Sequence, residues 1–409
     1  MAGFNLQRCP KVSKDTGIRT MPPEETLKRV IPLLEKAGMD PLEDITGRDN
    51  IGIPVYSVYR KETAKGTFGN YNGKGATPEQ AMASAVMEAM ERYSAEQRES
   101  DEVAYGTLQQ MRDSEMPYVE PADLILPARV MGMLESAEIA WTSCYDIMRG
   151  EDVWVPACAV FYPYYPDGDL QLFRFHTNGI ASGNTIEEAI LHAMFEVIER
   201  DAWSIAESFN RTNADVIVDD EDSVPAKLLK HFEDAGVRIR LKDLTTDVGV
   251  TTIGASSDDI RTKDPEMLDI GVGTHLNPEI AAIRAITEVA QSRTTHKHGL
   301  KVNAELQKKT REMGYEKVKE ANALWYYDSK RSIELSSMKD ESTEYVLDDI
   351  EIVLGKLMEA GFDRVIIADL TRPEIDVPTV RAIIPGMEVS TMDSEREGLR
   401  AWGRWPKKA

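Results

Sequence analysis

Long hydrophobic runs are missing from this sequence of 409 residues. No segment approaches the roughly 20 consecutive apolar residues that a membrane-spanning helix requires. Residues 1–10 also lack the apolar stretch of a secretory signal peptide. We therefore expect a globular protein that works in the cytoplasm without contacting a membrane, and its hydrophobic content of 42% is ordinary for that class.

Cysteine is scarce, with Cys9, Cys144 and Cys158 far apart in the chain. No pair has the C-x-x-C spacing of a zinc ribbon or a redox dithiol, so we expect reduced thiols with structural roles. The sequence also lacks the H-E-x-x-H, G-x-G-x-x-G and Ser-His-Asp signatures. These absences argue against zinc proteases, dinucleotide-dependent oxidoreductases and serine hydrolases.

Positive charge is in short supply. The 70 acidic residues outnumber the 48 basic ones, which gives a formal net charge of −22 at pH 7. A field of this sign repels nucleic acids and anionic lipids, so we expect neither as a partner. It would repel a nucleotide as well, and a nucleotide site in this chain therefore requires local metal ions or arginines.

What the sequence does contain is a pattern that occurs three times: an extended segment, a glycine turn, a helix-capping residue and a helix. The capping residues are Thr77, Thr185 and Asn277, which are residue types that accept hydrogen bonds from the amides of the first helical turn. Each unit is thus a strand, a glycine turn and a helix. The three helices are predicted near residues 77–98, 185–203 and 277–295.

The first two predicted helices carry acidic residues on one narrow stripe, at about 100° per residue. Their other faces are apolar nearly all round, whereas a surface helix is polar over about half of its circumference. The pattern therefore predicts largely buried helices whose acidic stripes line a cavity. The stripe residues are Ser84, Glu88, Glu91 and Arg92 in the first helix, and Glu188, His192, Glu196 and Glu199 in the second, with Arg200 at the edge of the stripe.

Carboxylates one helical turn apart repel each other. Burying them without partners costs roughly several kcal/mol for each charge, so a compensating cation is required. Ligands that are all oxygen favour a hard cation, and Mg²⁺ usually binds one or two carboxylates together with substrate phosphates. The stripes therefore predict a site for Mg²⁺ and a nucleotide triphosphate.

Other interpretations of these residues stay open. The E-x-x-E-R sequences that end at Arg92 and Arg200 could form internally salt-bridged surface helices. The repeat could be architectural with active residues in only some copies, because the third copy departs from the pattern at Gln291. The Gly-Lys-Gly turn at residues 73–75 looks like a phosphate loop but lacks the Walker A spacing. Arg293 could contact a phosphate or stabilise the end of its helix.

At these residues the sequence resembles the YcaO family, and within it the stand-alone members that are found in methanogens and associated with the partner TfuA. The resemblance extends over most of the chain. The segments that carry it are GIRTMPPEETLKRV, GKGATPEQAMASAVMEAMER, NGIASGNTIEEAILHAMFEVIERDAW and GVGTHLNPEIAAIRAITEVAQSR.

The resemblance implies a YcaO-type α+β fold with mixed sheets, built from the repeated strand–glycine turn–helix units, in which buried helices line a nucleotide site. Residues 1–300 would form the nucleotide-binding core. Residues 301–409 would form a C-terminal lobe within the same domain, for which the sequence predicts helices over 303–322 and 344–360 and a strand over 364–370.

The resemblance also implies that ATP and Mg²⁺ are the cofactors, with no Walker motif. Glutamates would hold the metal, and Arg200 and Arg293 would steady phosphate oxygens. No residue of the chain need act as the nucleophile. The implied metal ligands are Glu88, Glu91, Glu196 and Glu199, and the implied ATP contacts are Ser84, Asn184, Glu188, Arg200, Gln291, Arg293, Arg19 and Lys14.

The activity implied by the resemblance is ATP-dependent activation of a peptide backbone amide. Azoline-forming members carry a PxPxP tail and a peptide-binding clamp, whereas this chain ends in WPKKA. The expectation is therefore thioamide formation with an external sulfide source, on a glycine of methyl-coenzyme M reductase. A TfuA-like sulfur-delivery partner and a homodimer belong to the same expectation.

Two alternatives remain. The first is an azoline-forming cyclodehydratase that acts on Cys, Ser or Thr side chains. The second is an accessory protein that binds nucleotide without turning it over.

Overall fold

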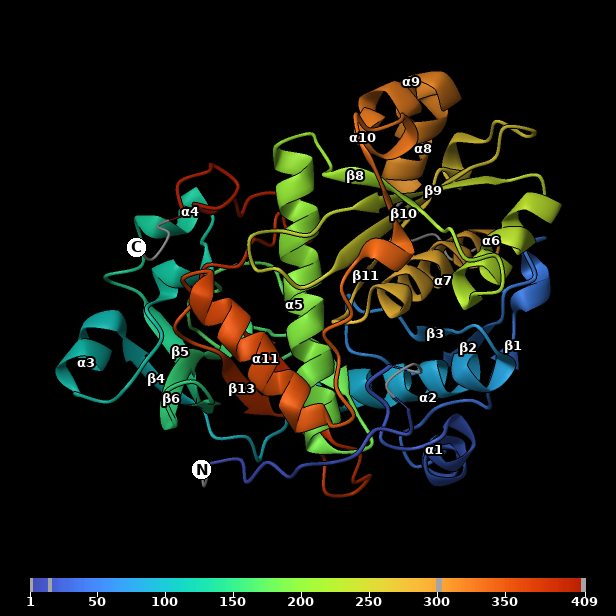
Figure 1. The fold of residues 1–409 in the computed structure, drawn as a ribbon. Coiled ribbons are helices and arrows are strands. Elements are labelled where there is room, and N and C mark those ends of the chain that lie inside the picture. Colours follow the sequence, from blue (N-terminus) through green and yellow to red (C-terminus); the bar gives the residue numbers. More distant parts are fainter. Residues whose placement is uncertain (1–2, 14–16, 299–303, 406–409) are drawn as a thin grey trace.

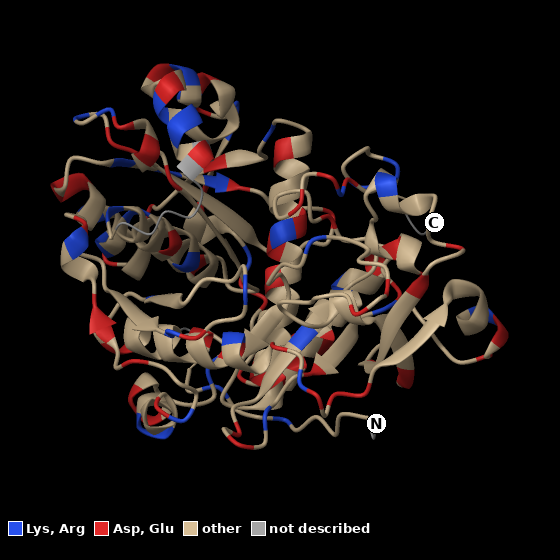
Figure 2. Cartoon of the chain, turned by 180° about the vertical axis from the view of Figure 1, so that it is seen from behind, with Lys and Arg blue, Asp and Glu red and all other residues tan. Residues whose placement is uncertain are grey.

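The computed structural model describes residues 3–13, 17–298 and 304–405 (Figure 1). Lys14, one of the predicted nucleotide contacts, lies outside the described residues. Within those ranges, no helix is both long enough and apolar enough to cross a membrane. Figure 2 shows acidic and basic segments interspersed through the fold, so the charges of either sign are not confined to one part of it.

The three sequence repeats form three strand–turn–helix units, which confirms the predicted α+β class. Each helix begins at the expected capping residue. The side chain of Thr77 accepts a hydrogen bond from the amide of Gln80, and Asn277 accepts from the amide of Ile280. The units are β3 (Asn70–Lys74) with α2 (Pro78–Ser94), β7 (Ile180–Ser182) with α5 (Ile186–Ser208), and β11 (Ile270–Thr274) with α7 (Pro278–Lys297).

Each repeat strand lies at one edge of a different sheet. β3 ends the three-stranded sheet, β11 begins the five-stranded sheet, and β7 ends the six-stranded sheet. Neighbouring strands are antiparallel except for β8 and β12. The orders are β1 (Glu43–Asp44), β2 (Val55–Tyr59), β3; then β11, β10 (Thr252–Asp258), β9 (Arg238–Asp243), β8 (Ala214–Ile217), β12 (Ser332–Glu334); and β4 (Ala104–Thr107), β5 (Glu138–Asp146), β13 (Ile366–Asp369), β14 (Thr379–Ile383), β7, with β6 (Glu151–Pro156) beside β5.

The remaining helices surround these units. In Figure 1, α5 runs through the middle of the molecule and α11 crosses it, while α8, α9 and α10 gather at one end. The predicted helix over 303–322 is interrupted at Gly314, whose φ of 78° ends one helix and starts the next. The helices are α1 (Pro23–Val30), α3 (Leu108–Asp113), α4 (Ala128–Met131), α6 (Val224–Asp234), α8 (Ala304–Met313), α9 (Tyr315–Ala321), α10 (Ala323–Tyr326) and α11 (Val346–Glu359).

The three units close into a ring, because each helix contacts its own strand and the strand of another unit. α2 contacts β3 and β7, α5 contacts β7 and β11, and α7 contacts β11 and β3. Side chains make the same links: the hydroxyl of Ser182 donates to the carbonyl of Met87 at 2.9 Å, and the amide of Thr274 donates to Glu199 at 3.1 Å. The arrangement directs the middles of the three helices toward one another.

Glycine is required where β3 meets α2. A Cβ atom added at Gly73 would lie 2.0 Å from the backbone nitrogen of Ala85, so a side chain would push the strand and the helix apart. We expect Gly73→Ala to lower the free energy of unfolding by about 1–3 kcal/mol, the usual cost of overpacking. Urea unfolding followed by circular dichroism measures this change.

The matched control is Gly132→Ala, because a Cβ atom there meets no atom within 4 Å and the backbone is right-handed helical. Its unfolding free energy should stay within about 0.5 kcal/mol of the original protein. Equal destabilisation by the two substitutions would contradict the close approach of β3 to α2.

Candidate active site

The acidic stripes of the repeat helices converge at the centre of the ring. Glu88, Glu196 and Glu288 occupy the same position in α2, α5 and α7. The charge of Glu288 contributes to raising the pKa of both Glu88 and Glu196, so these carboxylates lie within electrostatic reach of one another. All three are partly exposed, as expected for groups that line a cavity.

Two further glutamates lie deeper. Glu91 and Glu199 are buried, with 8% and 2% of their surface exposed. Burial raises the pKa of Glu91 to about 8, and the charges of Glu196 and Glu88 add to the effect although Arg92 opposes it. Burial likewise raises the pKa of Glu199. These raised pKa values mean that the positive charges nearby do not fully neutralise the glutamates, which leaves room for a bound cation.

The cations around the cluster come from all three units. Lys74 on β3 pairs with Glu288 at 3.0 Å, and Arg200 on α5 lies 3.9 Å from the other oxygen of Glu288. Burial alone would raise the pKa of Glu288, but Lys74 and Arg200 hold it below its usual range. Arg92 pairs with Glu88 at 3.5 Å, within the same helix.

Several buried donors beside the glutamates have no hydrogen-bond partner. They include Nε of Arg200, Nε of Arg284 and Nδ1 of His192. Arg284 is 3.7 Å from Glu199, and it shares the helical position of Ser84 and His192 in the other repeats. Unpartnered guanidinium N–H groups suit phosphate oxygens, and the oxygen-only carboxylate set suits Mg²⁺. The residues present therefore fit both cofactors.

The glutamates do not form a complete metal site by themselves. In the described part of the chain, no three or more His, Cys, Asp or Glu side chains are grouped closely enough to hold a metal ion. Mg²⁺ commonly takes only one or two carboxylates and completes its shell with phosphate oxygens and water. A nucleotide would have to supply the missing ligands.

The N-terminal segment lies against the start of α5. Arg19 pairs with Glu188 at 2.7 Å, and the amide of Thr20 donates to the same carboxylate at 3.0 Å. The side chain of Asn184 donates to Glu188 at 3.3 Å and accepts from the hydroxyl of Thr26 at 3.0 Å. The structure thus brings together Arg19, Asn184 and Glu188, three of the predicted nucleotide contacts.

Gln291 has a different partner. It holds the helical position of Glu91 and Glu199, and its side-chain amide donates to the carbonyl of Asn72 on β3. Glu199 accepts from the amide of Thr274 on β11 in the corresponding place. These two side chains therefore also join α7 to β3 and α5 to β11.

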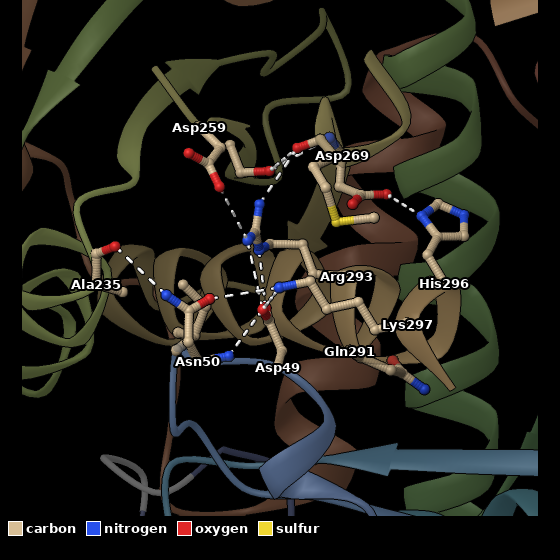
Figure 3. Close-up of polar contacts among 12 residues, drawn as sticks. Asp49, Asn50, Ala235, Asp259, Asp269, Gln291, Arg293, His296 and Lys297 are labelled. Atoms are coloured by element: carbon tan, nitrogen blue, oxygen red, sulfur yellow. Dashed lines mark hydrogen bonds and ion pairs between the residues drawn. The ribbon is translucent and has the colours of Figure 1, made fainter. Parts of the chain in front are cut away.

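Arg293 is not brought to the glutamates, although it was predicted to steady a phosphate. Figure 3 shows its side chain reaching Asp49, while Gln291 points elsewhere. Arg293 is fully buried; its Nε donates to Asp49 at 2.8 Å and one terminal nitrogen lies 3.9 Å from Asp259. Lys297 pairs with Asp49 as well. The guanidinium group of Arg293 therefore holds α7 against the segment that precedes β2.

Sequence reasoning missed several residues at the centre of the ring. Glu288 was visible in the third copy, at the position of Glu88 and Glu196, but the neighbouring departures hid it. Lys74 was visible in the glycine turn, and the structure turns it toward Glu288. Arg284 had no sequence signal, because the other copies have Ser84 and His192 in its place.

Comparisons with known proteins agree with this geometry. A family model described as YcaO cyclodehydratase, ATP- and Mg²⁺-binding, matches residues 72–388. An uncharacterized protein of Methanothermobacter thermautotrophicus is 45% identical over 380 residues, which cover 92% of this chain and 97% of that protein. A protein of Rhizobium leguminosarum bv. trifolii, named as lying in the tfuA 3′ region, is 30% identical over 403 residues, 94% of this chain and 92% of its own.

One solved structure combines a similar fold with bound ligands. YcaO from Methanopyrus kandleri, bound with AMPPCP and Mg²⁺, superposes with a TM-score of 0.79 at 30% identity. The match covers 95% of this chain and 98% of that one. It confirms the expected type of fold.

Proposed function

The chain belongs to the YcaO family, whose cofactors are ATP and Mg²⁺, and we propose that it uses ATP to convert a peptide backbone amide into a thioamide. The observation that carries the proposal is that five glutamates from three helices lie within electrostatic reach of one another and of cations from all three units. The rhizobial relative, named as lying in the tfuA 3′ region, supports a TfuA-like partner. The proposed target is a glycine of methyl-coenzyme M reductase, with a TfuA-like protein delivering sulfide.

The glutamates are proposed to hold the metal, and the surrounding cations to hold the nucleotide. Glu88, Glu91, Glu196 and Glu199 keep the roles expected from the sequence, and Glu288 joins them because Lys74 and Arg200 keep it ionised. Arg200 has an unpartnered Nε and would steady a phosphate oxygen. The other proposed nucleotide contacts are Ser84, Asn184, Glu188, Arg19 and Gln291.

The reaction needs no nucleophile from the chain. When bound, ATP supplies a phosphoryl group to the amide oxygen, which lets that oxygen leave as phosphate after sulfide has added to the carbon. The residues orient the reacting groups and neutralise their charge, as in other phosphoryl transfers. Because the glutamates are buried or half-buried, their interactions with bound ions are screened less than they would be in water.

The family description names a cyclodehydratase, so azoline formation is the second candidate. Product mass separates the two reactions. Incubation with a candidate peptide, ATP, Mg²⁺ and sulfide should release ADP and exchange one oxygen for one sulfur in the peptide. Loss of one water would instead indicate azoline formation, and nucleotide binding without turnover of any peptide would indicate an accessory role.

The raised pKa values of the glutamates predict proton release when the cofactors bind. Metal ligands must be deprotonated, and Glu91 has a pKa of about 8 in the metal-free protein. Affinity for Mg²⁺–AMPPCP should therefore increase as the pH rises from 6 toward 8. Calorimetry at pH 7 in two buffers of different ionisation enthalpy should give different apparent heats. Identical heats in both buffers would contradict the raised pKa values.

A further inference from the structure

A small cavity of about 50 Å³ lies beside α5, between the acidic centre of the ring and the C-terminal segment. Its lining includes Phe173, His176, Asn178, Val197, Arg381 and Arg396. Arg381 is on β14, and the charge of Glu196 acts on its guanidinium group. Glu196 is the residue before Val197 in α5. The cavity therefore adjoins the proposed cofactor site but is lined by other residues.

Two buried arginines in this lining have no carboxylate partner. Among the described residues, neither Arg381 nor Arg396 forms an ion pair, and they are 2% and 4% exposed. Arg396 donates to the carbonyls of Ile125 and Leu124 and lies 3.9 Å from the ring centre of Phe173, with Asp393 and Glu388 acting only at longer range. Burial lowers the pKa of each guanidinium to about 10.

Arg381 is the less satisfied of the two. One terminal nitrogen reaches the carbonyl of Val160 at a long 3.4 Å, and its Nε has no partner. The guanidinium group stays charged at neutral pH and has only N–H donors, so its unpartnered N–H group needs an acceptor. A buried cation with so few acceptors and no carboxylate is unfavourable, and a bound anion would relieve this.

The hydrogen bonds around His176 cannot all be satisfied by protein atoms. Its Nδ1 lies 3.2 Å from Arg381 and its Nε2 lies 2.8 Å from Arg396, so both ring nitrogens face N–H donors. A neutral imidazole accepts through only one nitrogen and donates through the other. Burial and the two arginines push the pKa of His176 well below its usual value, so the ring is neutral. One guanidinium is therefore left facing another donor.

Asn178 also places an unpartnered side-chain atom at the cavity. It is 4% exposed, lines the cavity, and its side-chain oxygen has no hydrogen-bond partner. The amide can turn its NH₂ group into the cavity, which would add one more donor. We infer that this cavity binds a small inorganic anion, which accepts hydrogen bonds from Arg381, Arg396 and His176.

The size of the cavity limits the anion to the scale of hydrosulfide or a halide, because the volume corresponds to only a few water molecules. If the proposed function holds, the anion is hydrosulfide held next to the reacting amide. Its sulfur lone pair forms the C–S bond while the carbonyl π pair moves to oxygen. The oxygen then leaves with its bonding pair as phosphate, and the S–H proton passes to solvent, which leaves C=S.

Bromide is the probe that tests the site independently of turnover. Crystals of the full chain soaked in sodium bromide should show an anomalous bromine peak between Arg381 and Arg396. Asn178→Asp places a negative charge in the cavity and should abolish the peak, whereas Asn5→Asp, the same substitution at an exposed residue that does not line the cavity, should keep it. No peak in the original protein, or an unchanged peak in Asn178→Asp, would overturn the proposal.

Steady-state kinetics test the hydrosulfide role. Asn178→Asp should raise the KM for sulfide at least tenfold while the KM for ATP changes less than twofold. Equal changes in both would contradict a sulfide subsite. If the original protein makes thioamide but binds no bromide, the anion site fails alone. If bromide binds but no thioamide forms with any peptide, the proposed function fails and the anion site stands.

Discussion

Glu196→Gln is expected to weaken the binding of Mg²⁺–AMPPCP by at least about 100-fold, or about 2.7 kcal/mol. Glutamine has the shape of glutamate but lacks the charge, and Glu196 lies at the equivalent position to Glu88 and Glu288 where the three helices converge. The pKa of Glu196 is raised by burial, so removing its charge relieves rather than creates an unpaired buried group. The free energy of unfolding should therefore stay the same or increase.

Calorimetry measures the affinity, and urea unfolding measures the stability. Glu207→Gln is the matched control, because Glu207 is an exposed residue of the same helix and should leave both quantities unchanged. Affinity of Glu196→Gln equal to that of the original protein would remove Glu196 from the metal site. Weak binding accompanied by a large loss of stability would instead indicate a structural role.

Arg200→Met and Arg293→Met are expected to have opposite effects, although both arginines were predicted to contact phosphate. Arg293→Met should destabilise the fold by about 3 kcal/mol, because it removes a fully buried partner of Asp49. Nucleotide affinity in the remaining folded protein should be unchanged. Arg200→Met should leave stability nearly unchanged, because the ion-pair contacts of Arg200 with Glu199 and Glu288 are long and methionine can still pack on Trp203. The same substitution should weaken Mg²⁺–AMPPCP binding at least tenfold.

Unfolding curves and calorimetry on the two variants separate these outcomes. Lys297 still pairs with Asp49 after Arg293 is removed, so the variant should remain folded at room temperature. A loss of nucleotide binding in folded Arg293→Met would restore the role expected from the family resemblance. Unchanged binding in Arg200→Met would remove Arg200 from the phosphate site.

The repeated units were predictable from the sequence because their signals are local. Thr77, Thr185 and Asn277 cap their own helices, and the apolar faces with acidic stripes follow from helical periodicity alone. The ring was not predictable, because contacts such as that between Ser182 and Met87 join units that are far apart in the sequence. Nothing local to either residue indicates the other.

Arg293 shows where motif reasoning and helix geometry disagree. Two residues apart on a helix means about 200° of rotation, so Gln291 and Arg293 point to nearly opposite sides. In the structure the side chain of Gln291 contacts β3, whereas the side chain of Arg293 pairs with Asp49. The same periodicity applied to the third copy would have placed Glu288 on the stripe.

The interpretation of E-x-x-E-R as an internally salt-bridged helix is confirmed for the ion pairs of α2 but not for its position on the surface. Arg92 does pair with Glu88 and Glu91 inside its own helix. The helix is nevertheless packed on two sheets, and the pairs lie at the centre of the ring rather than on an outer face. One arginine for two glutamates leaves the pKa of Glu91 raised, so the pairing does not neutralise the cluster.

The central claim is that glutamates from three helices meet around the cofactors. Crystals grown with Mn²⁺ and AMPPCP test it directly, since Mn²⁺ replaces Mg²⁺ and is located by its anomalous scattering. We predict an anomalous peak that is coordinated by at least one of Glu88, Glu196 and Glu288 together with phosphate oxygens. A nucleotide and metal bound elsewhere, with Glu88 still paired to Arg92 and Glu288 still paired to Lys74 and Arg200, would contradict the account.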